Sequence, residues 1–243
     1  MRKNRNLLLL GCLLAGSCLA SLSHANPVVS MELTGTNGAS LNQLYTAPYY
    51  AQIGPAGLTQ DSQFNSTSSE SVAVYCDDLY DDVSAGQVWQ ATVTNMSQLS
   101  TTSLDTSLMF HDMSPGRQAE DYMAAAWLAE QIAGGKLSTV QSELDSYALW
   151  LIFDPQALSG LSKTDHGLVW GDYEDAFDAV KNDTPSDFDN VNIYTPLDDT
   201  PGSAGSQEYF TVDAPEPGTL ALMAVGLAGL GWMARRRRQS QSV

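Results

Sequence analysis

The strongest helical pattern of the chain is SPGRQAEDYMAAAWLAEQIAGG, residues 114–135. Ser114 followed by Pro115 is a common helix start, because the first helical position does not need the backbone N–H that proline lacks. Gly134-Gly135 is a typical helix end. Between these ends, apolar residues recur at the spacing of one helix face, namely Ala119, Tyr122, Met123, Ala126 and Trp127. This stretch predicts a long amphipathic helix.

Two more helices are expected after it. Ser138 and Gln141 have capping-box spacing and begin a second helix, which Asp154-Pro155 ends. The apolar face of this helix carries Val140, Leu144, Tyr147, Ala148 and Leu151. A third and shorter helix is predicted from Asp172 to about Lys181, with inward-facing Tyr173, Phe177 and Val180.

Strands are expected on both sides of the helical middle. The patterns typical of strands occupy residues 28–53, 71–79, 86–93 and 207–212. Polar stretches rich in glycine and serine are expected to be loops, at residues 54–69 and in an acidic linker at 182–206. Strands, then helices, then a strand predict a single α+β domain over residues 26–213.

The N-terminus has the pattern of a secretory signal peptide. Basic residues precede an apolar run at residues 7–20, and a small-x-small cleavage site ends at Ala25. We therefore expect residues 1–25 to form a signal helix that is cleaved after Ala25. The alternative is a lipoprotein modified at Cys12 or Cys18, which the flanking residues fit less well.

A second apolar segment lies near the C-terminus, from Thr219 to Ala234. Its sixteen residues would span about 24 Å as a helix, which a bilayer core of about 30 Å accommodates by local thinning. Because basic residues favour the cytoplasmic side, we expect a transmembrane helix at 219–234 with the preceding chain outside the cytoplasm. The basic cluster that follows consists of Arg235, Arg236, Arg237 and Arg238.

The residues before this segment are Pro215, Glu216, Pro217 and Gly218. The two prolines disfavour helix, so this approach to the membrane is extended and accessible to a protease. The whole order over residues 214–238 resembles the PEP-CTERM sorting signal, which exosortase-type membrane proteases recognise in exported bacterial proteins. The resemblance implies an intermediate anchored in the inner membrane with its C-terminus in the cytoplasm, followed by a cell-surface or extracellular location. A plain anchor that is never cut is the alternative.

The exported body is strongly acidic. Residues 26–218 contain all 28 acidic residues and four basic ones, a formal charge of about −24. This charge excludes nucleic acid and anionic membrane surfaces as partners and favours solubility and cation association. We expect no cofactor, with Ca²⁺ as a hypothesis from the charge. Two groups of oxygen ligands, neither with EF-hand spacing, motivate it: Asp77, Asp78, Asp81 and Asp82, then Asp183, Asp187, Asp189, Asn190 and Asn192.

The histidines and glycines indicate no catalytic site, so we expect a non-enzymatic protein. His111 and His166 are not spaced as metal ligands relative to Cys76 or to each other. No glycine-rich loop for phosphate is present. Asp165 beside His166 leaves a secreted hydrolase as an alternative, in which the carboxylate would orient the imidazole towards a serine.

Cys76 is the candidate reactive thiol. A lone thiol in an exported protein is buried and inert, paired with another chain, or reactive. Its setting, Val74-Tyr75-Cys76-Asp77, resembles the cysteine segment of bacterial thioester adhesin domains, and Ala148-Leu149-Trp150 resembles their second motif. In that family the sulfur is bonded to a glutamine side chain two residues before the alanine, and the acyl group captures a host amine. Here that position is Ser146, which has no acyl carbon.

The exported body also contains four tryptophans, and aromatic rings commonly bind sugars. Three of them, Trp89, Trp127 and Trp150, occupy core-like positions, whereas Trp170 is the candidate for exposure. The combined prediction is an exported surface or extracellular-matrix protein with an exosortase-like protease and, as a hypothesis, exopolysaccharide as partners. A thioester-type covalent adhesin using Cys76 and a secreted hydrolase are the alternatives.

Overall fold

The computed structural model of the chain describes residues 26–59, 61–64, 71–79, 81–112, 114–197 and 206–213. The predicted signal helix at 1–25 and the predicted transmembrane helix at 219–234 lie outside the described residues. Within the described part, no helix combines the length and the apolar character needed to cross a bilayer.

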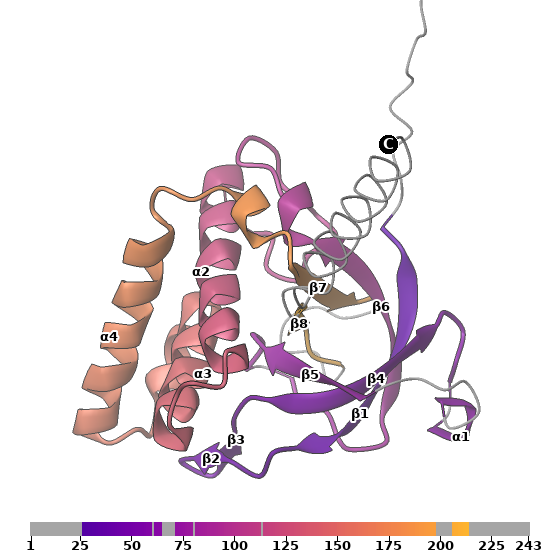
Figure 1. The fold of residues 1–243 in the computed structure, drawn as a ribbon, viewed down its shortest axis with the longest axis horizontal. Helices are drawn as coiled ribbons and strands as arrows, with labels where there is room; N and C mark the ends of the chain where they lie inside the picture. The colour runs from indigo at the N-terminus through magenta and orange to yellow at the C-terminus, as the bar shows by residue number, and fades with distance from the viewer. Residues whose placement is uncertain are drawn as a thin grey trace, which may run out of the picture.

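Six antiparallel strands form a closed barrel (Figure 1). Their order around the barrel is β1 (Val28–Thr36), β4 (Tyr49–Pro55), β5 (Ser71–Cys76), β8 (Tyr209–Val212), β7 (Val191–Pro196) and β6 (Val88–Asn95). Strand β1 closes the ring, because Met31 pairs with Ile53 of β4 on one side and with Trp89 of β6 on the other. Closure leaves these strands without an open sheet edge.

Side chains fill the interior of the barrel. The ring of Tyr209 on β8 lies 6.0 Å from the ring of Tyr49 on β4 and 5.9 Å from that of Trp89 on β6. Neither strand neighbours β8, so these contacts cross the barrel. All three rings are buried, and Met31 and Cys76 are buried beside them. The barrel is therefore a packed core and not a channel.

Three helices cover one side of the barrel (Figure 1). They are α2 (Pro115–Ala133), α3 (Thr139–Phe153) and α4 (Lys163–Val180), and each packs against the other two. Helix α2 lies on β8, where Tyr122 contacts Phe210 with ring centroids 6.1 Å apart. Helix α4 is the outer helix, and its fully buried side chains are Val169, Ala176 and Val180.

Short elements complete the described fold. Strands β2 (Ser40–Leu41) and β3 (Leu44–Tyr45) form a hairpin against α3, since the Tyr147 hydroxyl donates to the Leu41 carbonyl at 2.8 Å. The others are α1 (Asp61–Phe64) and the 3₁₀ helices η1 (Met96–Gln98), η2 (Pro155–Leu158) and η3 (Pro185–Phe188).

The α+β class is confirmed, with the first two predicted helices observed as α2 and α3. Ser138 caps α3 by accepting a hydrogen bond from the Gln141 N–H at 3.2 Å. The third helix is longer than predicted and begins at Lys163 instead of Asp172. Ser162 caps this earlier start by accepting from the Asp165 N–H.

The prediction of a loop over residues 182–206 is wrong at residues 191–196, which form β7 between β6 and β8. The apolar-polar alternation, with Asn192 between the buried Val191 and Ile193, is short and lies in a stretch of the chain that is otherwise polar. Pairing with two neighbours stabilises this segment as a strand, and that pairing is a long-range property.

The helical layer offers a test of core packing with a matched control. Leu149 of α3 is fully buried. The prediction that Val140 lies on the buried face of the same helix is wrong, because this residue is in the first turn and is 63% exposed. We expect Leu149→Ala to lower the free energy of unfolding by about 2 to 5 kcal/mol, because it leaves a cavity. Val140→Ala should change it by no more than about 0.5 kcal/mol. Urea unfolding followed by tryptophan fluorescence measures both, and equal effects would contradict the placement of α3.

Candidate functional site

Cys76 ends β5 inside the barrel. Its side chain is 2% exposed, and the thiol donates a hydrogen bond to the Asp78 carbonyl at 3.0 Å. Burial raises the pKa of the Cys76 thiol well above its usual value, and the nearby carboxyls of Asp78 and Asp77 raise it further. The thiol is therefore held protonated, and a protonated thiol is a poor nucleophile. This is the environment of an inert core cysteine.

Ser146 occupies the place of the glutamine in the second thioester-like motif. It is buried on α3, where its hydroxyl donates to the Ser142 carbonyl at 2.7 Å and accepts from the Ala47 N–H at 3.1 Å. These bonds attach α3 to the chain just before β4. Trp150 from the same motif does lie beside the Cys76 thiol. The two motifs thus meet in the fold, but Ser146 contributes a structural hydrogen bond and no acyl group.

A buried pair of carboxyls lies next to Cys76. Asp77 follows β5 and Glu208 precedes β8, and both side chains are completely buried with their carboxyls facing each other. Burial raises the pKa of Asp77 well above its usual value, and the facing Glu208 adds to this. Burial also raises the pKa of Glu208, although hydrogen bonds offset part of that effect. Because two facing carboxylates without a cation repel each other, we expect the pair to share one proton.

Glu208 accepts hydrogen bonds from three further parts of the fold. The Tyr122 hydroxyl of α2 donates to one carboxyl oxygen at 2.5 Å. The Met109 N–H, at 3.1 Å, and the Thr195 hydroxyl of β7 donate to the other. Glu208 falls within the strand predicted at 207–212 and was given no role there, so the sequence prediction missed this site. An acidic residue inside a predicted strand was the available signal.

A pocket of about 230 Å³ lies next to the buried carboxyl pair, and its lining residues include Asp78 and Gln207 but not Cys76. The aromatic side chains Tyr45, Tyr49 and Trp150 form part of its wall. Asp78 and Asp82 add carboxyls, and the described lining residues include no basic side chain. The pocket therefore suits neutral or cationic groups better than anions.

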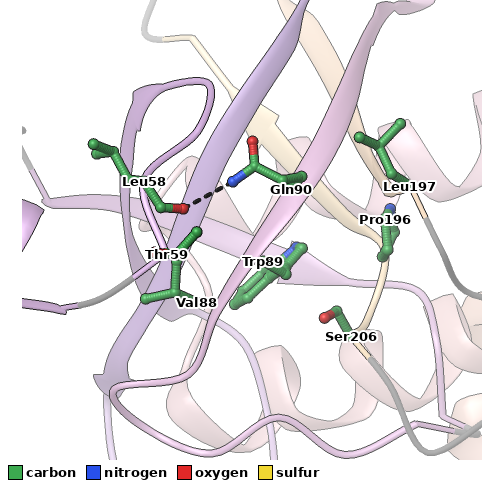
Figure 2. A pocket seen from close by; sticks show the side chains of 8 residues that line it. All are labelled: Leu58, Thr59, Val88, Trp89, Gln90, Pro196, Leu197 and Ser206. Atoms are coloured by element: carbon green, nitrogen blue, oxygen red, sulfur yellow. Dashed lines mark hydrogen bonds between the residues drawn. The ribbon is translucent and has the colours of Figure 1, made fainter.

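A second pocket, of about 320 Å³, lies at the end of the barrel where β6 and β7 meet the turn after β4 (Figure 2). Gln90 fixes this turn by donating to the Leu58 carbonyl at 2.9 Å and to the Ser30 hydroxyl at 2.7 Å. The Gly57 N–H donates back to its amide oxygen at 2.9 Å. The amide of Gln90 is thus occupied by hydrogen bonds within the pocket wall, and Trp89 is a further lining residue.

A row of aromatic side chains runs along α4, and we call Trp170, Tyr173 and Phe177 the α4 aromatic stripe. The rings of Trp170 and Tyr173 are stacked, with centroids 5.3 Å apart and planes 29° apart. Tyr173 and Phe177 follow at 4.8 Å. Trp170 is 44% exposed, as predicted, whereas Trp89 and Trp150 are buried and Trp127 is partly buried.

The histidines lie apart from any catalytic arrangement in the described residues. His111 Nδ1 lies 2.7 Å from the Leu108 carbonyl oxygen. His166 is exposed on α4, and the neighbouring Asp165 carboxylate accepts from the Ser162 hydroxyl at 2.7 Å. Asp165 therefore takes part in the helix cap, which gives the hydrolase alternative no support.

The predicted calcium ligands are dispersed in the described structure. Asp77, Asp78 and Asp81 are buried, and Asp187 caps η3. Asn190 donates to the Glu130 carboxylate at 2.8 Å. Among the described residues, no three His, Cys, Asp or Glu side chains are grouped to hold a metal ion.

The buried thiol gives a direct chemical prediction. We expect native protein to resist an alkylating reagent at Cys76 and to react fully after unfolding, with the intact mass of a free thiol. A Val140→Cys variant, at a position 63% exposed, should react in the native state and serves as the control. A mass lower by one ammonia, lost on treatment with methylamine, would contradict this and indicate a thioester.

The carboxyl pair predicts a pH dependence of stability. The folded-state pKa values of Asp77 and Glu208 are raised, so the unfolded chain releases these protons at lower pH than the folded chain. Their contribution is therefore most favourable at acidic pH and is lost as the pH rises from the unfolded values through the folded ones. Asp77→Asn replaces the shared proton with an amide donor, so its stability should fall less between about pH 5 and about pH 8. Urea unfolding at each pH measures this, with the exposed Asp183→Asn as control; equal slopes for all three proteins would contradict it.

Comparison with known proteins adds one weak structural likeness. No curated protein matches the chain. Among solved structures, the chain is similar to the N-terminal thioester domain of fibronectin-binding protein SfbI from Streptococcus pyogenes, with 10% sequence identity and a TM-score of 0.40. The match covers 80% of this chain and 97% of that one. At this level no residue's role carries over.

The sorting signal is confirmed. Residues 213–238 match the PEP-CTERM protein-sorting motif, which includes the Pro215–Gly218 segment and the arginines 235–238. The motif implies export, a membrane-anchored intermediate, processing by an exosortase-like membrane system, and a surface or extracellular location. The match begins at Asp213, directly after β8. The chain therefore carries a PEP-CTERM protein-sorting motif joined to an α+β barrel domain.

Proposed function

We propose that this chain is a non-enzymatic surface or extracellular-matrix protein that an exosortase-like enzyme processes and that associates with exopolysaccharide. The observation that carries the proposal is the position of the sorting motif. The motif begins at Asp213, the residue that directly follows β8, so cleavage within the motif leaves every strand of the barrel in place.

The charge of the body supports a matrix location. Residues 26–218 carry a formal charge of about −24, so molecules of this protein repel one another and the anionic polymers of a cell envelope. This repulsion keeps the protein dispersed and hydrated. The same charge disfavours attachment to nucleic acid or anionic lipid. Neutral or cationic matrix components are the partners that this negative charge favours.

The local chemistry favours noncovalent attachment over the two alternatives. A covalent adhesin needs an activated acyl group, and Ser146 supplies a hydroxyl that is engaged with Ser142 and Ala47. The buried Cys76 thiol, whose raised pKa favours the protonated form, also argues against a covalent adhesin. A hydrolase that used His166 as its base would need a carboxylate to orient the imidazole. The neighbouring Asp165 carboxylate instead accepts a hydrogen bond from Ser162 in the helix cap.

Mass spectrometry of the protein from its native cells tests the sorting step. We expect a mature C-terminus close to Pro217, because the prolines keep that segment extended at the membrane face. Replacing Arg235, Arg236, Arg237 and Arg238 with glutamine should remove the topological signal and leave the precursor unprocessed. The barrel of the variant should be unaffected, since the changes lie beyond β8. Recovery of native protein that ends at Val243 in the membrane fraction would contradict the proposal and indicate a plain anchor.

A further inference from the structure

The α4 aromatic stripe is placed where a ligand can reach it. Helix α4 lies on the outside of the helical layer (Figure 1), and most of its side chains are partly or fully exposed. Residues 170, 173 and 177 follow the i, i+3, i+7 spacing of one helix face, so the three rings form a continuous row. Trp170, at 44% exposure, is the accessible end, and Tyr173 and Phe177 both pack against the core.

Contacts from α2 hold the stripe in place. The Arg117 guanidinium lies over the Phe177 ring, with its central carbon 4.9 Å from the ring centroid. Its Nε donates to the Asp121 carboxylate at 2.9 Å, and its side chain also hydrogen-bonds with Tyr173. Two of the three rings are therefore fixed before a ligand arrives, and a fixed surface loses less entropy on binding.

The size of the stripe favours a glycan over a protein partner. A stable protein interface buries about 800 Å² on each partner, which three rings in a row do not provide. A sugar ring needs less, because one face of a pyranose carries C–H groups that stack on an aromatic ring while its hydroxyls form hydrogen bonds at the edge. The exposed Glu174 carboxylate lies one turn along α4 from Trp170 and is an acceptor for such hydroxyls. The next carboxylate along this face, Asp178, forms an ion pair with Lys181 at 3.4 Å.

Charge decides which glycans fit. Acidic residues 172, 174, 175 and 178 lie along the same half of α4, on a body with a formal charge of about −24. Uronate, sulfate or phosphate groups would be repelled there. We propose that the α4 aromatic stripe is a binding platform for an uncharged polysaccharide, which stacks on the exposed face of Trp170 while Tyr173 supports the other face of that ring. This inference rests on the proposed association with exopolysaccharide and assigns it a site and a ligand class.

Binding to an array of uncharged and anionic oligosaccharides tests the site with the full exported body. We expect wild-type protein to bind at least one uncharged glycan and no uronate-containing one. Trp170→Ala should weaken this binding by roughly 2- to 10-fold, the range for loss of one aromatic stacking partner, and Trp170→Phe should retain most of it. Leu168→Ala is the matched control, since Leu168 is 49% exposed on the same helix and outside the stripe, and it should bind like wild type. Unchanged thermal melting of the three variants shows that folding is intact.

Three outcomes would overturn the inference. They are silence on every uncharged glycan, equal binding by wild type and Trp170→Ala, and an effect of Trp170→Ala on self-association by size-exclusion chromatography without an effect on glycans. Co-sedimentation with the native exopolysaccharide is measured separately. If wild type and Trp170→Ala co-sediment equally, the site assignment fails and the proposed function stands; if neither co-sediments, the association itself fails.

Discussion

The carboxyl of Glu208 joins the separate parts of this fold at one buried point. It faces Asp77 beside β5 and accepts hydrogen bonds from Tyr122 of α2, Thr195 of β7 and the Met109 N–H. A buried carboxyl is costly to desolvate, and these partners together with one shared proton offset that cost. Because β8 closes the barrel between β5 and β7, the same bonds fix the last strand to both layers of the domain.

The position of β8 also links the fold to its processing. The strand is the last element of the described structure, and the sorting motif begins directly after it. A barrel that closes with this strand is complete without the residues of the sorting motif. The interior is filled by Tyr49, Trp89 and Tyr209, and the two pockets described above border on it through Trp89 and Tyr49.

Local signals were enough to predict the helical layer. The Ser138 cap and the apolar rows of α2 and α3 are properties of neighbouring residues, and the structure has both helices as expected. Strand β7 could not be found in this way, because Val191–Pro196 is stabilised by pairing with β6 and β8, which lie far away in the chain. The start of α4 was missed because two glycines, Gly167 and Gly171, obscured a helical pattern that packing against α2 and α3 sustains.

Export and sorting follow from one-dimensional order alone: a proline pair, an uncharged run and a basic cluster are read by the membrane and its protease as a linear segment. The state of the chemical groups depends on contacts that the linear order does not contain. The pKa of the Cys76 thiol is raised because the barrel closes around it, and the pKa of Asp77 is raised because folding buries it and places it against Glu208. Tyr173 and Phe177 are held in place because Arg117, from another helix, hydrogen-bonds with the first and lies over the ring of the second, and Trp170 stacks on Tyr173. Burial and long-range contact set pKa values and ring positions, and both arise only when distant segments pack together.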